Sequence, residues 1–170
     1  MLTRDAILRL FEKLNHRLVD QKINGELYLV GGAVLCLSLQ ARPSTRDIDS
    51  YFAPADKIRR AAQKIADEED LNPNWLNDAV KGYLSDKGKF ENFLDLSNLK
   101  VLIATPEYLL AMKCLAMRFG KEFHDEADVR FLLRYLNIEK YHDALTVISK
   151  FYPHDRFPKK TLYALEEMLR

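Results

Sequence analysis

A short apolar segment ending in two adjacent glycines constrains this chain more than any other feature of its 170-residue sequence. Residues 26–30 predict a buried strand that leads directly into Gly31 and Gly32, and residues 33–40 then show the pattern of a helix. Because glycine lacks a Cβ, backbone N–H groups at such a turn can approach a phosphate chain closely, and the following helix N-terminus adds positive potential. A lone Gly-Gly is more often an ordinary tight turn, so this segment needs a second feature beside it.

The second feature is an Asp-x-Asp motif that follows the glycines after fourteen residues. Residues 47–52 alternate like a strand, so Asp47 and Asp49 share one face while Ile48 points to the other. Two like charges side by side repel each other unless a cation neutralises them, and Mg²⁺ prefers such oxygen ligands. An isolated Asp-x-Asp is more often a solvated strand end. Together with the glycine turn, however, the motif predicts a site for a metal-bound phosphate chain.

The remaining pattern predicts a mixed α/β (α+β) fold, in which a small mixed sheet is flanked by helices. Thr3 is a candidate cap for a first helix that ends near Asp20, and Pro54 suits the start of a helix after the second strand. Residues 72–88 resemble a packed loop. Two further strands are expected at residues 90–96 and 99–104, and helices are expected at residues 107–118, 124–136, 138–151 and 159–169. We therefore expect a core of residues 1–104 and a helical C-terminal region of residues 105–170 packed on it.

Composition excludes several classes of protein. Hydrophobic residues make up 48% and charged residues 30%, which is typical of a globular chain and not of a disordered one. With 26 Lys and Arg against 25 Asp and Glu, overall charge gives no argument for nucleic acid or an anionic membrane. Cys36 and Cys114 lie far apart in apolar stretches, so buried thiols are expected. No apolar run approaches the roughly 20 residues that span a bilayer, and we predict a cytoplasmic protein.

The two motifs resemble the DNA polymerase beta-like nucleotidyltransferase superfamily, which has a Gly-Gly or Gly-Ser turn, a helix and then Asp-x-Asp or Asp-x-Glu. The chain is more closely similar to nucleotidyltransferase-like proteins grouped with the abortive-infection toxins of AbiEii type. The residues that support this closer resemblance are Leu29 to Ala33, Arg42, Thr45 to Asp49, Phe52, Trp75 to Ala79, Pro106 to Lys113, Arg118 and Asp125 to Asp128.

The resemblance implies transfer of a nucleoside monophosphate from a nucleoside triphosphate to an acceptor hydroxyl, with release of pyrophosphate. Asp47 and Asp49 would hold one or two Mg²⁺ ions, and the backbone of Gly31 and Gly32 would hold the triphosphate. The candidate donors to the triphosphate oxygens are Arg42, Thr45, Arg46 and Lys113.

A third carboxylate completes the metal site in the superfamily, and Asp95 is our candidate because it lies on a later predicted strand. Glu91 and Asp78 are the alternatives. If no acid occupies that position, the acceptor hydroxyl loses its general base. The chain would then be a catalytically silent nucleotide-binding or regulatory partner protein, which is the alternative to the transferase.

Two other groups have both a structural and a functional interpretation. Lys113 lies on the apolar side of its helix and could pair with Asp125 and Asp128 or contact the nucleotide. Asn77 and Asp78 could cap a turn anchored by the neighbouring tryptophan or line the acceptor side of the site, and capping is favoured.

The acceptor is not determined by the sequence, because RNA ends, a protein hydroxyl and a small molecule such as an aminoglycoside all suit this core. The resemblance to AbiEii-type toxins further implies a toxin with a protein antitoxin as partner. Phosphatases that form an aspartyl-phosphate also begin from Asp-x-Asp, but there the motif follows a long apolar strand. Sugar transferases with this motif normally need a larger chain. Both classes are therefore disfavoured.

Overall fold

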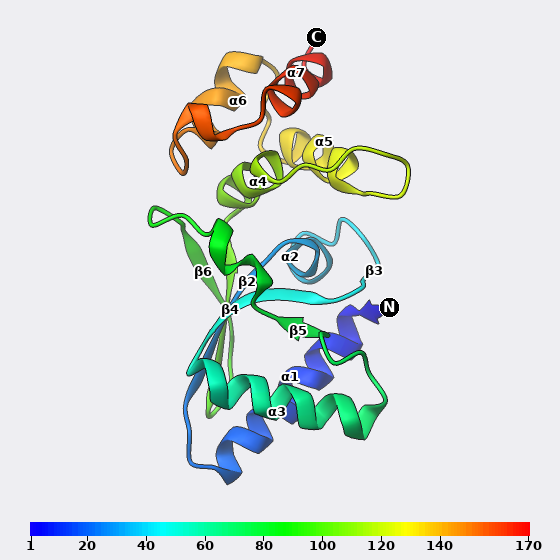
Figure 1. The fold of residues 1–170 in the computed structure, drawn as a ribbon, viewed down its shortest axis with the longest axis vertical. Helices are drawn as coiled ribbons and strands as arrows, with labels where there is room; N and C mark the ends of the chain where they lie inside the picture. The colour runs from blue at the N-terminus through cyan, green and yellow to red at the C-terminus, as the bar shows by residue number, and fades with distance from the viewer. The chain divides into compact units, whose positions relative to one another are not determined.

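The computed structural model describes residues 1–170, which form two compact units (Figure 1). The first unit contains residues 1–82 and 90–104, and the second contains residues 83–89 and 105–170. The predicted mixed α+β class is confirmed, because the chain forms seven α-helices, a five-stranded sheet and a two-stranded sheet. No helix combines the length and the apolar character that crossing a membrane requires.

The first unit is built around the five-stranded sheet. Its strands, in spatial order, are β5 (Leu76–Asn77), β4 (Ile48–Ala53), β2 (Gly25–Val30), β7 (Leu99–Ala104) and β6 (Phe90–Asp95). The pairs β4–β5 and β2–β7 are parallel, and the pairs β2–β4 and β6–β7 are antiparallel. The helices of this unit are α1 (Arg4–Asp20), α2 (Gly32–Leu37) and α3 (Ala55–Glu69), and the 3₁₀ helix η1 (Ala79–Tyr83) follows β5.

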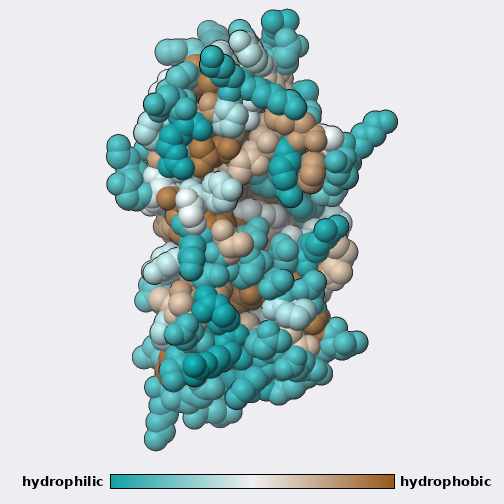
Figure 2. Space-filling view, viewed as in Figure 1, coloured by the Kyte–Doolittle hydropathy of each residue, from teal (hydrophilic) through white to brown (hydrophobic).

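Helices α1 and α3 lie side by side against one face of the sheet (Figure 1). Both are amphipathic, and their apolar stripes are fully buried, as the helical spacing predicts. The predicted cap of α1 is confirmed, because the Thr3 hydroxyl accepts a hydrogen bond from the Ala6 N–H at 3.2 Å. Figure 2 shows the outer surface over α1 and α3 as mostly hydrophilic, and ion pairs such as Arg9–Glu69 at 3.1 Å join the two helices there.

The strands of the sheet alternate between a helix-covered face and an open face. Leu27 and Leu29 on β2 are completely buried beneath the helices, and Phe52 on β4 is buried with them. Tyr28 and Tyr51 point the opposite way, and Tyr51 is 44% exposed. The sheet therefore buries one side, and the other side, called the open face below, is accessible at Tyr51 and in part at Tyr28, whereas Val30 and Ala104 on it are buried.

The second unit is helical. It contains α4 (Pro106–Leu115), α5 (Asp125–Tyr135), α6 (Tyr141–Ile148), α7 (Lys159–Met168) and the 3₁₀ helix η2 (His154–Arg156). Thr105 caps α4 through a bond from the Tyr108 N–H at 3.4 Å, and Pro106 occupies the first turn, as predicted. Tyr108 is completely buried and stacks on Phe151 with ring centroids 5.1 Å apart. Tyr108 and Phe151 thus belong to the core of this unit, together with aliphatic residues such as Leu109 and Leu132.

Three short strands and the end of one helix differ from the sequence-based expectations. Ser44–Thr45, within a segment predicted as a loop, forms β3 and pairs with β1 (Leu2–Thr3) in the two-stranded sheet. Leu76–Asn77, also within a predicted loop, forms the edge strand β5. Helix α2 ends at Leu37, short of the predicted residue 40. Two-residue strands have no measurable periodicity, so their pairing partners define them and their own sequence does not.

Candidate functional site

The Gly31–Gly32 turn joins β2 to α2 at one end of the sheet. Gly31 has φ 69° and ψ −149°, a conformation that is essentially restricted to glycine. A Cβ at Gly31 would lie 3.1 Å from Oδ2 of Asp49, and a Cβ at Gly32 would lie 2.8 Å from Oγ1 of Thr45. The backbone conformation of Gly31 favours glycine, and the side chains closest to the two Cβ positions belong to predicted site residues. Because α2 has only six residues, we attribute any phosphate affinity to the turn and not to a helix dipole.

The Asp-x-Asp motif lies beside this turn. Asp49 is on β4 in register with Val30, the residue before Gly31, and both point to the open face of the sheet. Asp47 immediately precedes β4, so strand alternation places it on the same face as Asp49, while Ile48 is buried on the other. Both carboxylates are partly accessible. The structure therefore brings the glycine turn and Asp49 together, with Asp47 two residues before Asp49 in the chain.

Three polar side chains precede the motif on the connection from α2. Thr45 is buried and donates its hydroxyl hydrogen to the Asp47 carbonyl at 3.1 Å, which fixes the segment that leads into β4. Arg42 lies at the turn, since its Nη1 would be 3.1 Å from a Cβ on Gly32. Arg46 is exposed. Arg42 and Thr45 are thus adjacent to the glycine turn.

Asp95 is not brought to the paired aspartates. Asp95 pairs in register with Lys100 on β7. Lys100 in turn pairs in register with Glu26, the second residue of β2. Asp49, in contrast, registers with Val30 at the last residue of β2. Strand register therefore places Asp95 and Asp49 at opposite ends of the sheet, and Asp95 cannot act as the third carboxylate of a metal site at Asp49.

The two alternative acids are also directed elsewhere. Glu91 registers with Ile103, which registers with Leu29, so its position belongs to the helix-covered face. The Asp78 carboxylate accepts a bond from Arg59 of α3 at 2.7 Å. In addition, no group of three His, Cys, Asp or Glu side chains is placed to hold an ion together. The sheet offers two carboxylates at this position and no third.

The residue that registers with Asp49 on the neighbouring strand β5 is an amide, Asn77. Its Oδ1 accepts from the Ala79 N–H at 3.2 Å, and its Nδ2 donates to the Asn74 carbonyl at 3.1 Å. The predicted capping role of Asn77 is therefore confirmed. Nothing in the sequence indicated that this amide lies next to Asp49, because the pairing depends on a long-range parallel contact.

Lys113 lies in the second unit, where its ammonium group contacts two carboxylates. Its Nζ is 3.1 Å from Oδ1 of Asp125 and 2.8 Å from Oδ2 of Asp128, and all three side chains are largely buried. Arg118 adds a bond from Nε to Oδ2 of Asp125 at 2.9 Å. The predicted ion pair between α4 and α5 is confirmed. These contacts explain Lys113 by the packing of α4 on α5, and its contact with the nucleotide stays a prediction.

This cluster predicts loss of stability in acid. Burial raises the pKa of Asp125, but the Arg118 hydrogen bonds and the Lys113 charge outweigh burial, so the net pKa is lowered. A lowered carboxyl pKa contributes stability above the unfolded pKa of about 4, and this contribution is lost as pH falls through the folded pKa. Urea unfolding should therefore show that wild type exceeds Arg118→Ala in free energy of unfolding at pH 6 and that the difference shrinks towards pH 3. A pH-independent difference would contradict this explanation.

Replacing Gly31 by alanine should disrupt the turn. The strained backbone costs about 1–3 kcal/mol, and the new Cβ would meet the Asp49 carboxylate. We expect a lower free energy of unfolding by roughly that amount and weaker binding of nucleoside triphosphate, measured by calorimetry. Gly82→Ala is the matched control, because nothing lies within 4 Å of its Cβ position. Equal effects of the two substitutions would argue against a special role for Gly31.

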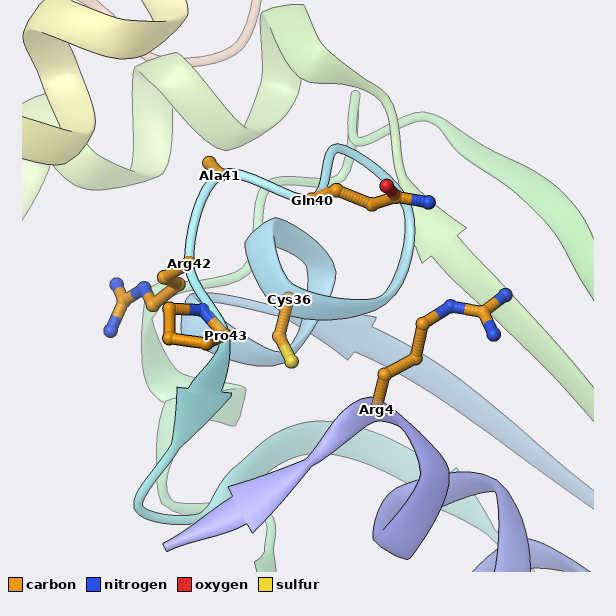
Figure 3. Close-up of a pocket in the computed structure, with 6 residues that line it drawn as sticks. All are labelled: Arg4, Cys36, Gln40, Ala41, Arg42 and Pro43. Atoms are coloured by element: carbon orange, nitrogen blue, oxygen red, sulfur yellow. The ribbon is translucent and has the colours of Figure 1, made fainter.

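A pocket of about 470 Å³ lies on the other side of the α2–β3 connection, lined by Arg4, Cys36, Gln40, Ala41, Arg42 and Pro43 (Figure 3). Figure 3 shows the Cys36 sulfur pointing inward, whereas the Arg4 and Arg42 side chains extend in opposite directions. Burial raises the pKa of the Cys36 thiol, against the opposing effect of the two arginine charges. The guanidinium groups do not converge, so this pocket is a poorer phosphate site than the glycine turn.

Comparison with known proteins agrees with this geometry. Residues 5–155 match the family described as nucleotidyltransferase of unknown function, DUF6036. The chain belongs to this family. Its membership supports nucleotidyl transfer as the general activity, and the match includes the glycine turn and both motif aspartates. Neither a curated protein nor a solved structure matches the chain. The DUF6036 description names no substrate, so the acceptor must be inferred from the residues themselves.

Proposed function

We propose that this chain transfers a nucleoside monophosphate from a Mg²⁺-bound nucleoside triphosphate to an acceptor hydroxyl. The acceptor oxygen forms a bond to the α-phosphorus, the bond to the oxygen between the α- and β-phosphates breaks, and pyrophosphate leaves. The acceptor proton passes to solvent. When bound, Mg²⁺ would neutralise phosphate charge and stabilise the attacking and leaving oxygens.

One observation supports this proposal above the others: Oδ2 of Asp49 lies 3.1 Å from the position that a Cβ on Gly31 would take. A carboxylate and a glycine turn that admits a phosphate chain are therefore adjacent. The donors at Asp47 and Asp49 are hard oxygens, which fit Mg²⁺ well. In this proposal the two aspartates hold the ion, and the backbone at Gly31 and Gly32 binds the triphosphate.

The side chains around the turn would orient the triphosphate. Arg42 would donate to its oxygens from beside Gly32, because a guanidinium group matches phosphate geometry. Thr45 would act by fixing the backbone of Asp47, whose carbonyl it already binds. Arg46, which follows Thr45 and is exposed, would contact the outgoing pyrophosphate.

We further propose that the protein acts as a toxin with an antitoxin partner, in the manner that its resemblance to AbiEii-type proteins implies. The support is the resemblance of segments that follow the motifs in the chain, Trp75 to Ala79 and Pro106 to Lys113. An acceptor essential to growth, such as RNA or a protein hydroxyl, would suit that role, and the cytoplasm would be its location.

A second candidate is a nucleotide-binding partner that does not transfer. The observation in its favour is Asn77, an amide in register with Asp49 on the next strand, together with the distant position of Asp95. Without a third carboxylate, the acceptor hydroxyl depends on the metal alone to lower its pKa. Retained nucleotide binding without transfer would distinguish this candidate from the enzyme.

Label transfer separates the two candidates. The chain is incubated with Mg²⁺ and with each of the four nucleoside triphosphates in turn, labelled at either the α- or the γ-phosphate. Total RNA and total protein are added as candidate acceptors. The transferase predicts that α-label enters an acceptor and that γ-label appears only in pyrophosphate. If neither label enters an acceptor while calorimetry detects Mg²⁺-dependent nucleotide binding, the non-transferring partner is supported.

A further inference from the structure

The open face of the five-stranded sheet presents an aromatic cluster beside the proposed transfer site. Alternation along β2 and β4 places Tyr28 and Tyr51 in register with each other on this face. Phe90 on β6 joins them, since its ring lies 5.2 Å from that of Tyr28 in an edge-on arrangement. Tyr28 and Tyr51 have ring centroids 5.8 Å apart. We call Tyr28, Tyr51, Phe90 and Leu102, which registers with Tyr28 on β7, the aromatic face.

These side chains are not used to build the core. Tyr51 is 44% exposed, and Tyr28, Phe90 and Leu102 are half-buried, whereas the alternate residues on the same central strands are buried under the helices. The Tyr28 hydroxyl donates to the Glu26 carboxylate, which holds this ring in place. A rigid exposed aromatic surface loses little conformational entropy when it binds a ligand.

The aromatic face is continuous with the proposed metal site. Asp49 and Tyr51 lie two residues apart on β4 and point the same way, so they are separated by about 7 Å along the strand. Phe90 registers with Ala104, one residue beyond the pair Leu29–Ile103, so it is level with the Asp49 end of the sheet. A polymer whose end reacts at Asp49 would therefore extend across these rings.

Aromatic rings on an exposed sheet face are a stacking surface for unpaired bases. A peptide would pair with a sheet edge instead, where backbone groups are available. We propose that the aromatic face binds the terminal bases of a single-stranded nucleic acid acceptor, whose 3′-hydroxyl then lies at Asp49. This inference rests on the proposed function and names the acceptor class of that same site.

The charged residues beside the aromatic face predict how binding depends on salt. Lys100 and Glu26 register with each other, so the basic group is balanced by an acidic one. Binding should therefore depend on stacking more than on phosphate contacts, so log affinity plotted against log salt concentration should have a shallow slope, between about −1 and 0. It should also favour single strands over duplexes, because bases in a duplex are already stacked.

The test is binding of fluorescein-labelled five-nucleotide RNA and DNA single strands to the full chain, measured by anisotropy. Tyr51→Ala should weaken binding by about fivefold or more, whereas Tyr51→Phe should retain most of the affinity. Tyr163→Ala is the matched control, because that tyrosine is 67% exposed but lies in the second unit. Binding of Mg²⁺ and nucleoside triphosphate should be unchanged in Tyr51→Ala.

Several results would overturn the inference. The first is that the wild type binds no oligonucleotide, and the second is that Tyr51→Ala and wild type bind oligonucleotide with equal affinity. The third is that Tyr51→Ala loses nucleoside triphosphate binding, which would mean that the Tyr51 ring contacts the base of the nucleotide. A wild-type dimer that Tyr51→Ala dissociates, detected by sedimentation equilibrium, would assign this face to self-association. Failure of the proposed function has a different signature: Tyr51-dependent oligonucleotide binding persists, but no nucleotide binds or transfers.

Discussion

Replacing Asp49 by asparagine should reduce nucleotidyl transfer on the order of a thousandfold. The substitution removes one of the two carboxylates beside the glycine turn, and metal stabilisation of the transferring phosphate contributes several kcal/mol to the barrier. Asparagine has nearly the same shape as aspartate, so the chain should still fold and its transfer rate can be compared with that of wild type. Initial rates of α-label transfer and urea unfolding without Mg²⁺ measure the two effects separately.

Asp56→Asn is the control for this substitution. Asp56 lies in the first turn of α3, its side chain is 84% exposed, and it pairs with Arg59 at 3.1 Å. Its loss should change transfer by less than about twofold, because exposed pairs contribute little. Transfer by Asp49→Asn at the wild-type rate would contradict the assignment of Asp49 as a metal ligand.

Replacing Lys113 by methionine should cause the largest loss of stability, about 3–5 kcal/mol. The side chains of Asp125 and Asp128 are only 5% and 10% exposed, and Lys113 at 13% is a counter-charge common to both. Methionine leaves two buried carboxylates with less compensation, so the free energy of unfolding should fall sharply at neutral pH. Chemical unfolding at pH 7 measures this loss.

Two further variants test whether the loss of stability in Lys113→Met comes from the buried carboxylates. Lys150→Met removes an exposed lysine from the same unit and should change the free energy of unfolding by less than about 0.5 kcal/mol. The double variant Lys113→Met with Asp128→Leu should recover part of the loss, because it also removes one buried carboxylate. A small effect of Lys113→Met alone would show that solvent reaches the cluster and screens it.

Local patterns in the sequence predict the long elements of this fold. Helical spacing identifies α1 and α3, and the capping residues Thr3 and Thr105 mark the first residues of α1 and α4 to within one residue. The apolar runs of β2 and β7 are equally clear. These elements are predictable because their signals lie within a few residues, where the side-chain period and the caps act directly on the backbone.

The candidate site is predictable only where it is local. Gly31 and Asp49 follow from two short motifs, and the structure places them next to each other. Asp95 failed as a third carboxylate because β6 runs antiparallel to β7, so its last residue emerges at the other end of the sheet. The pairing of Asn77 with Asp49 was likewise missed, since strand order and direction are set by long-range contacts.

The aromatic face is predictable from the sequence only in part. Spacing alone places Tyr51 on the face of Asp49, because the two residues are two apart on one strand. The approach of Phe90 to Tyr28 could not be predicted, because it requires the spatial order β4, β2, β7 and β6.

The most direct measurement is a crystal structure of the chain with Mn²⁺ and an α,β-methylene nucleoside triphosphate, which cannot release pyrophosphate. We expect an anomalous peak within coordination distance of the Asp47 and Asp49 carboxylates, with the triphosphate against the backbone of Gly31 and Gly32. A nucleotide bound elsewhere, or a triphosphate at the turn with no metal at the two aspartates, would contradict it.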